Sequence, residues 1–113
     1  MTQSSGVFTF PATGIYFIQF ITSHTADNID GLLQIQVETT TDGTNFGGAS
    51  EQMCGISRAS DANTFVTSFV FDVTNVSTHK CRFVVASVSS DTTTHGHSSQ
   101  NETHATFIKL GDT

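Results

Sequence analysis

"GVFTFPATGIYFIQF", residues Gly6 to Phe20, carries five aromatic rings and the only proline of the chain. Within "PATG", Pro11 fixes its own backbone angle and Gly14 accepts conformations that other residues avoid. The stretch therefore predicts two β-strands joined by a turn, the second of them central in a sheet because both of its faces are largely apolar. One face holds Ile15, Phe17, Gln19 and Ile21, and the other holds Tyr16, Ile18 and Phe20.

The rest of the chain repeats this strand pattern. Leu33, Ile35 and Val37 alternate with polar residues, which is typical of a strand with one buried face. Further strand-like periods cover residues 32–38, 49–57, 64–73, 79–88 and 103–110, and no segment has a helical period over the length of a helix. Seven short strands separated by turn signals predict an all-β antiparallel β-sandwich, a jelly roll.

The length of 113 residues suits one domain. We expect a short N-terminal tail at residues 1–5 and a single jelly-roll domain at residues 6–113, with residues 92–101 as an exposed polar loop. An apolar fraction of 36% predicts a thin core, which ten phenylalanines partly offset because each ring buries a large apolar area.

The charge of the chain excludes several partners. The formal net charge is −6, and the only basic side chains are Arg58, Lys80, Arg82 and Lys109. Nucleic-acid binding needs a cationic surface that displaces phosphate counterions, so no nucleic-acid partner is expected, and an anionic membrane surface is disfavoured for the same reason. The first residues lack the basic start and apolar run of a secretory leader, so export by that route is not expected unless a leader has been removed.

Histidines supply the candidate metal ligands. His95 and His97 are two residues apart, which in a strand places both rings on one side, and His104 follows shortly after. Zinc would need three or four such ligands at about 2 Å. Because the segment is polar and loop-like, the alternative is a solvated loop, and we expect no metal and no cofactor.

Two other groups of residues have both a structural and a functional interpretation. Asp27, Asp30 and Asp42 lie at turns, where a carboxylate either binds calcium or, more commonly, accepts hydrogen bonds from its own loop. Cys54 and Cys81 are expected to be buried free thiols, with a disulfide between them as the alternative.

No catalytic constellation is present in the sequence. There is no "GxSxG" nucleophile elbow and no pair of carboxylates at a suggestive spacing, and "FGGAS" lacks the lysine of a phosphate-binding loop. We therefore expect a protein that is not an enzyme.

The opening motif resembles the hallmark of the trimeric jelly-roll superfamily of the complement globular head and tumour necrosis factor. There, an aromatic strand runs through a Pro/Gly turn into a Gly-aliphatic-Tyr-Phe strand. "FVFDVTNVSTHKCRFVV" is similar to a pair of apolar strands of that family, and "ATFIKLGDT" is similar to its final strand, which lies near the subunit interface. The ending "FIKLGD" looks more like bacterial and phage members than animal ones.

One departure from the family pattern concerns the start of the chain. Family members usually carry one or more strands before the opening motif, whereas here only residues 1–5 precede it. The chain is a minimal version, or an upstream part is missing, or another subunit supplies the cover. In each case a sheet edge is left exposed, and exposed edges recruit partners.

The resemblance implies a homotrimer whose subunits meet on an apolar sheet face. We expect that interface at Tyr16, Ile18 and Phe20 and, on the final strand, at Phe107, Ile108 and Leu110. The predicted function is a trimeric decoration protein on a phage capsid, located at the virion surface and bound to a capsid or other virion protein. The alternatives are a fibre knob that binds a host receptor or glycan, and a secreted, extracellular ligand-binding trimer.

Overall fold

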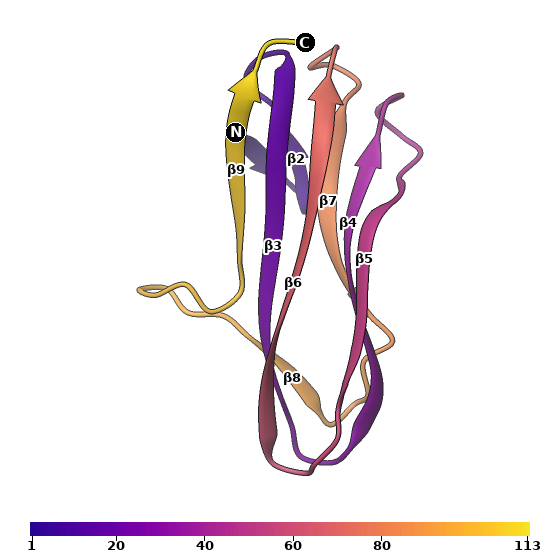
Figure 1. Ribbon diagram of the computed structural model, residues 1–113, viewed down its shortest axis with the longest axis vertical. Coiled ribbons are helices and arrows are strands. Elements are labelled where there is room, and N and C mark those ends of the chain that lie inside the picture. Colours follow the sequence, from indigo (N-terminus) through magenta and orange to yellow (C-terminus); the bar gives the residue numbers. More distant parts are fainter.

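The structure, a computed structural model that describes all residues 1–113, consists of nine β-strands (Figure 1). None of its elements is a helix of the length and apolarity needed to cross a membrane. The strands are β1 (Thr2–Ser4), β2 (Val7–Thr9), β3 (Gly14–Ala26), β4 (Asp30–Thr40), β5 (Gly47–Ile56), β6 (Asp61–Val73), β7 (Lys80–Ala86), β8 (Thr92–His95) and β9 (His104–Gly111).

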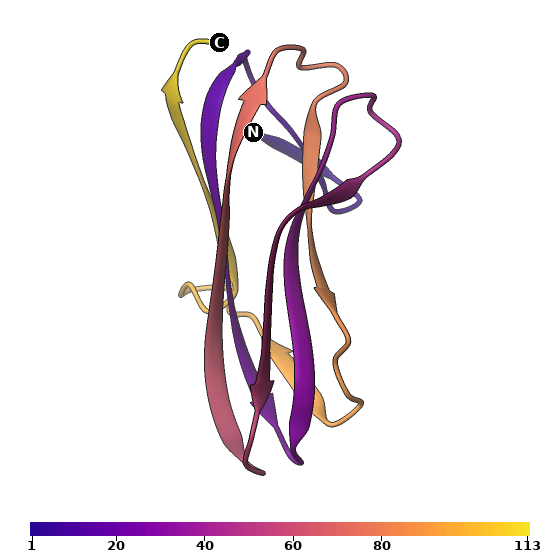
Figure 2. The ribbon, with the colours of Figure 1, turned by 45° about the vertical axis from the view of Figure 1, so that its right-hand side comes forward.

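The strands form two antiparallel sheets that face each other (Figure 2). Sheet A has the order β1-β2-β7-β4-β5. In sheet B, β3 is central: β6 pairs with one side of it along its whole length, and β9 and β8 share the other side. This arrangement confirms the predicted all-β antiparallel sandwich and is consistent with a jelly roll.

Two strands were not expected from the sequence. Residues 1–5, the predicted tail, contribute β1, which pairs with β2 in sheet A. The hairpin between them turns at Ser5 and Gly6, both with positive φ, the conformation that two-residue hairpins prefer. The predicted loop at residues 92–101 begins with β8, whose threonines favour a strand but show no apolar alternation.

The core lies between the sheets. Ile18 of β3 and Leu33, Ile35 and Val37 of β4 are fully buried, which confirms the buried face predicted for β4. Aromatic rings fill the rest of the space: Phe20 stacks on Phe83 of β7 with ring centroids 4.7 Å apart. Further ring contacts, each worth roughly 1 kcal/mol beyond its burial, join Phe8, Phe10, Tyr16, Phe71 and Phe107.

The predicted interface on β3 is wrong. Tyr16 and Phe20 are almost completely buried inside the single subunit, as is Ile18 between them, so none of the three is free to meet another copy. Phe107 also points inward, against Phe8 and Phe83. Both faces of residues 15–21 are largely apolar, so alternation distinguishes them only through Gln19, which marks its own face as the outer one.

Candidate interaction surface

The outer face of sheet B carries a row of apolar side chains across three strands. Phe17 of β3 lies opposite Val70 of β6 and opposite Ile108 of β9, so the three side chains are neighbours on one face. Val70 is 54% exposed and Ile108 is 49% exposed, while Phe17 is half-buried between them. A continuous apolar row on a surface is typical of a protein interface.

More apolar side chains lie on the same face on either side of this row, and the polar residues Gln19, Ser68 and Thr106 separate it from those on one side. Ile21 of β3 lies opposite the exposed Val66 of β6, and Ile15 and the exposed Leu110 lie toward the other end. We call this surface the outer patch of sheet B; it consists of Ile15, Phe17, Ile21, Val66, Val70, Ile108 and Leu110. Of the side chains predicted at an interface, the structure therefore leaves Ile108 and Leu110 exposed.

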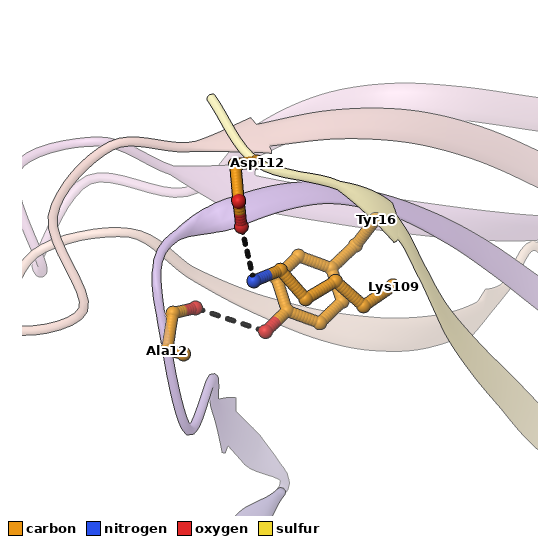
Figure 3. A network of polar contacts seen from close by, with 4 residues as sticks. All are labelled: Ala12, Tyr16, Lys109 and Asp112. Atoms are coloured by element: carbon orange, nitrogen blue, oxygen red, sulfur yellow. Dashed lines mark hydrogen bonds and ion pairs between the residues drawn. The ribbon is translucent and has the colours of Figure 1, made fainter.

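The end of β9 lies close to the start of β3, where the Lys109–Asp112 ion pair lies beside the hydrogen bond between Tyr16 and Ala12 (Figure 3). Gly14 has a φ of +147°, and a Cβ there would lie 2.3 Å from Cε of Lys109 and 2.6 Å from the carbonyl oxygen of Gly111. The hydroxyl of Tyr16 donates a hydrogen bond of 2.9 Å to the carbonyl oxygen of Ala12 and so closes the Pro-containing turn. The glycine thus lets the end of β9 approach the start of β3, and the tyrosine closes the turn that precedes β3.

The second edge of β9 has no strand partner, because β9 pairs only with β3. Its backbone N–H and C=O groups on that edge are therefore open to an added strand. A charged side chain, Lys109, lies toward the C-terminal end of this short strand and forms an ion pair of 2.7 Å with Asp112. Charges of this kind limit unspecific edge pairing.

The outer face of sheet A is more polar, although it also exposes Met53 of β5. The amides of Gln34 and Gln36 on β4 both donate hydrogen bonds to the carboxylate of Glu51 on β5. Arg82 of β7 forms an ion pair of 2.5 Å with Glu38 and stacks 4.5 Å from the ring centroid of Phe46. The polar groups of this face are satisfied by one another.

The structure does not gather the candidate metal ligands. His95 hydrogen-bonds through Nε2 to the hydroxyl of Thr25 at 2.7 Å, and Nδ1 of His97 accepts a hydrogen bond from the backbone N–H of Ser99. Nδ1 of His104 is buried without a partner. No group of three histidine, cysteine, aspartate or glutamate side chains is placed to hold a metal ion.

Two of the turn aspartates, Asp42 and Asp30, accept hydrogen bonds within the chain. Asp42 accepts hydrogen bonds from the backbone N–H groups of Thr44 and Asn45, each at 2.8 Å, and these bonds lower its pKa. Asp30 accepts from the backbone N–H of Ser89 and from the hydroxyl of Thr92, and the pKa of Asp30 is lowered, first of all by the Ser89 bond. Asp42 bonds its own loop, as expected of a turn residue, whereas Asp30 joins the start of β4 to the start of β8 and the residues before it.

The two cysteines are free thiols. Cys81 is buried in the core, and burial raises its pKa to about 12. Cys54 is partly buried, and burial raises its pKa as well. Because the thiolate is the reactive form, neither side chain is poised for nucleophilic chemistry.

A hollow of about 340 Å³ lies at the tip formed by the β3–β4 and β5–β6 turns, lined by Ile29, Asp30, Gly31, Gly55, Ile56 and Ser57. The carboxylate of Asp30, its only charged group, is already bonded to Ser89 and Thr92. The hollow therefore offers a ligand no free charged group, and the outer patch of sheet B is the better candidate for a functional surface.

Comparison of the chain with models of known protein families, with curated proteins and with solved structures finds no match. The surface itself is therefore the basis for the function proposed below.

Proposed function

We propose that this protein is a non-enzymatic virion structural protein: a homotrimeric jelly roll, similar to the complement globular head and tumour necrosis factor, that decorates a phage capsid. The observation that carries the proposal is the apolar row of Val70, Phe17 and Ile108 on the outer face of sheet B. In the trimer this patch meets the same patch of two neighbours, in place of the interface first expected at Tyr16, Ile18 and Phe20.

The sequence motifs support the superfamily and the source. The Gly-Ile-Tyr-Phe segment at residues 14–17 occupies the central strand of sheet B, and the final "ATFIKLG" segment pairs directly beside it. The ending at residues 107–112 resembles phage and bacterial members. The polar outer face of sheet A, with a net charge of −6 for the chain, suits the surface that such a trimer presents to solvent.

The oligomeric state is tested by light scattering at micromolar concentration. A trimer has three times the 12.1 kDa mass of the chain. Replacing Val70 by Lys should reduce the mass to that of one chain, whereas Met53→Lys, an equally exposed position on sheet A, should leave the trimer intact. A folded wild-type protein that stays monomeric would refute the trimer.

The role on the virion is tested separately by co-sedimentation with empty capsids of the virus that encodes the protein. A decoration protein saturates the capsids at a fixed number of copies per shell. A trimer that does not bind capsids but binds host cells would contradict the decoration role and would still support the trimer.

A specific feature favours a second candidate, the receptor- or glycan-binding knob of a head or tail fibre. The exposed segment between β8 and β9, residues 96–103, projects sideways from the sandwich (Figure 1). Loops of this kind, held by a rigid scaffold, commonly carry recognition. In the sedimentation experiment, binding to cells that is lost when residues 97–101 are replaced by a Gly/Ser linker would support this function instead.

A further inference from the structure

One histidine lies inside the sandwich and takes no part in the proposed interface. His24 of β3 is 1% exposed, and its ring packs against Phe65 of β6 with centroids 5.4 Å apart. Both ring nitrogens are hydrogen-bonded: Nε2 to the hydroxyl of Thr22 at 2.8 Å, and Nδ1 to the hydroxyl of Thr94 at 3.0 Å. The second bond joins the end of β3 to β8.

The strand that His24 holds is weakly attached. β8 has four residues and pairs only with Ser23–Ala26 of β3. Beyond β8 the chain runs through the exposed segment at residues 96–103, which is tied to β3 by a hydrogen bond of 3.2 Å from the backbone N–H of Ser23 to the hydroxyl of Thr103. Besides this short ladder, two threonine–histidine hydrogen bonds hold β8 to β3: Thr94 with His24, and Thr25 with His95.

The surroundings of His24 disfavour its charged form. Burial lowers the pKa of His24, and the neighbouring His95 on β8 lowers it further, while Asp30 on β4 has the smaller, opposite effect. Phe65 contributes no charge from β6. The carboxylate of Asp30 is already engaged by Ser89 and Thr92, so it cannot turn to form an ion pair with the ring without losing those bonds.

Separation of β8 from β3 would expose the His24 ring to protonation. If β8 separates from β3, the His24 ring reaches water and takes up a proton at the ordinary histidine pKa of about 6.5. The closed state binds fewer protons than the open state below that pH, so acid shifts the balance toward the open state. The start of β8 stays attached, because the lowered pKa of Asp30 keeps its bond to Thr92 well below pH 5.

We propose that His24 is an acid-sensitive latch, which holds β8 against β3 at neutral pH and releases the segment from Thr93 to Thr103 when the surroundings become acidic. The released segment forms a mobile arm beside the outer patch of sheet B. The inference does not depend on the trimer, because every contact that carries it lies within one chain.

Hydrogen exchange read by mass spectrometry tests the latch in the wild-type protein. The protection of β8 amides, corrected for intrinsic exchange rates, should fall by up to about 30-fold between pH 7.5 and pH 5.0, the limit for uptake of one proton by a group of ordinary pKa about 6.5. Protection in β4 and β5, which hold no histidine, should stay the same. Equal protection of β8 at both pH values would overturn the latch.

Two matched variants test whether His24 causes the pH dependence of β8 protection. His24→Gln keeps a side chain that can hydrogen-bond Thr22 and Thr94 but cannot titrate, so the pH step in β8 should disappear. His95→Gln removes the other histidine nearby and should keep the step. A step that survives in His24→Gln, or that is lost only in His95→Gln, would refute the role of His24.

A measurement on the wild-type protein covers the case in which His24→Gln does not fold. In an NMR titration, the ring signals of His24 should stay those of the neutral form until the β8 signals change, and both should then change together. Titration of His24 near pH 6.5 with unchanged β8 signals would contradict the latch.

Discussion

The outer faces of the two sheets differ although they belong to the same sandwich. On sheet A, Gln34, Gln36 and Glu51 bond to one another, and Arg82 pairs with Glu38. On sheet B, the corresponding surface holds the apolar row through Phe17, and the one ion pair of this sheet, Lys109 with Asp112, lies at the end of β9. A fold needs only its inner faces to be apolar, so the outer patch of sheet B is not explained by the folding of one subunit.

The difference assigns separate roles to the two faces. Polar groups that satisfy each other remain stable in water and give a neighbour little to gain by covering them. An apolar row gains roughly 25 cal/mol for each Å² that a partner removes from water. Self-association is therefore expected on sheet B and solvent exposure on sheet A.

The largest effect is expected from placing charges on the apolar outer face of sheet B. Val70→Lys combined with Ile108→Lys would place two charges in the proposed subunit interface, and we expect the association of the proposed trimer to weaken by about a thousandfold, or about 4 kcal/mol. Sedimentation equilibrium measures the association constant. The double change Met53→Lys and Val84→Lys on sheet A is the control, and equal weakening by both pairs would remove the distinction between the faces.

A second change disturbs the patch through the backbone. Gly14→Ala places a Cβ against Lys109 and Gly111 at a φ that favours glycine, so we expect a loss of about 3 kcal/mol in the free energy of unfolding. Urea denaturation measures it. Gly47→Ala at the start of β5 has open space and should cost less than about 1 kcal/mol; similar losses for both would show that the close approach at Gly14 is unimportant.

The two sheets are joined at the lower end by Asp30 of sheet A and Thr92 of sheet B. Asp30→Asn should lower the free energy of unfolding by about 2 kcal/mol at pH 7, because two donors lose a charged acceptor. The pKa of Asp30 is lowered in the folded state, so its contribution is present above the ordinary aspartate pKa and is lost as pH falls through the folded value. Denaturation at pH 7 and pH 3 should show the difference between wild type and variant shrinking with acid; a constant difference would exclude a charge effect.

The smallest effect is expected on the polar face. Arg82→Ala removes the ion pair with Glu38 and the contact with Phe46, both partly exposed. It should lower the free energy of unfolding by about 1 kcal/mol or less and leave the mass of the assembly in solution unchanged. Thermal unfolding and light scattering measure the two quantities. Loss of the trimer in this variant would mean that sheet A also takes part in assembly.

The sequence predicted the architecture best where one face of a strand was polar. β4 alternates between aliphatic residues and Gln or Glu, so its buried face could be assigned from the sequence. β3 offered two apolar faces, and the choice between them depends on partners that are distant in sequence, such as Phe83 for Phe20. The strand β8 could not be found by apolar alternation because its attachment uses hydrogen bonds of threonine and histidine.

The candidate surface was predictable in part. Alternation in β9 separates Phe107, which packs in the core, from Ile108 and Leu110, which are exposed, so only the last two of these predicted residues lie in the outer patch. Alternation in β6 places Phe65, Phe69, Phe71 and Val73 on one face, so the exposure of Val66 and Val70 on the other face also follows from the sequence. The latch at His24 needed the three-dimensional pairing of β3 with β8, which no local pattern contains.

The long ladder between β3 and β6 also has a consequence for how the chain reaches this state. All thirteen residues of β3 pair with thirteen of β6, and the whole β4–β5 hairpin lies between them in sequence. The hairpin can form locally within microseconds, but the ladder must wait for a large loop to close. Folding on the order of milliseconds to seconds is expected for such non-local pairing. During that time the aromatic residues of β3 are exposed to solvent, and the chain is prone to aggregate.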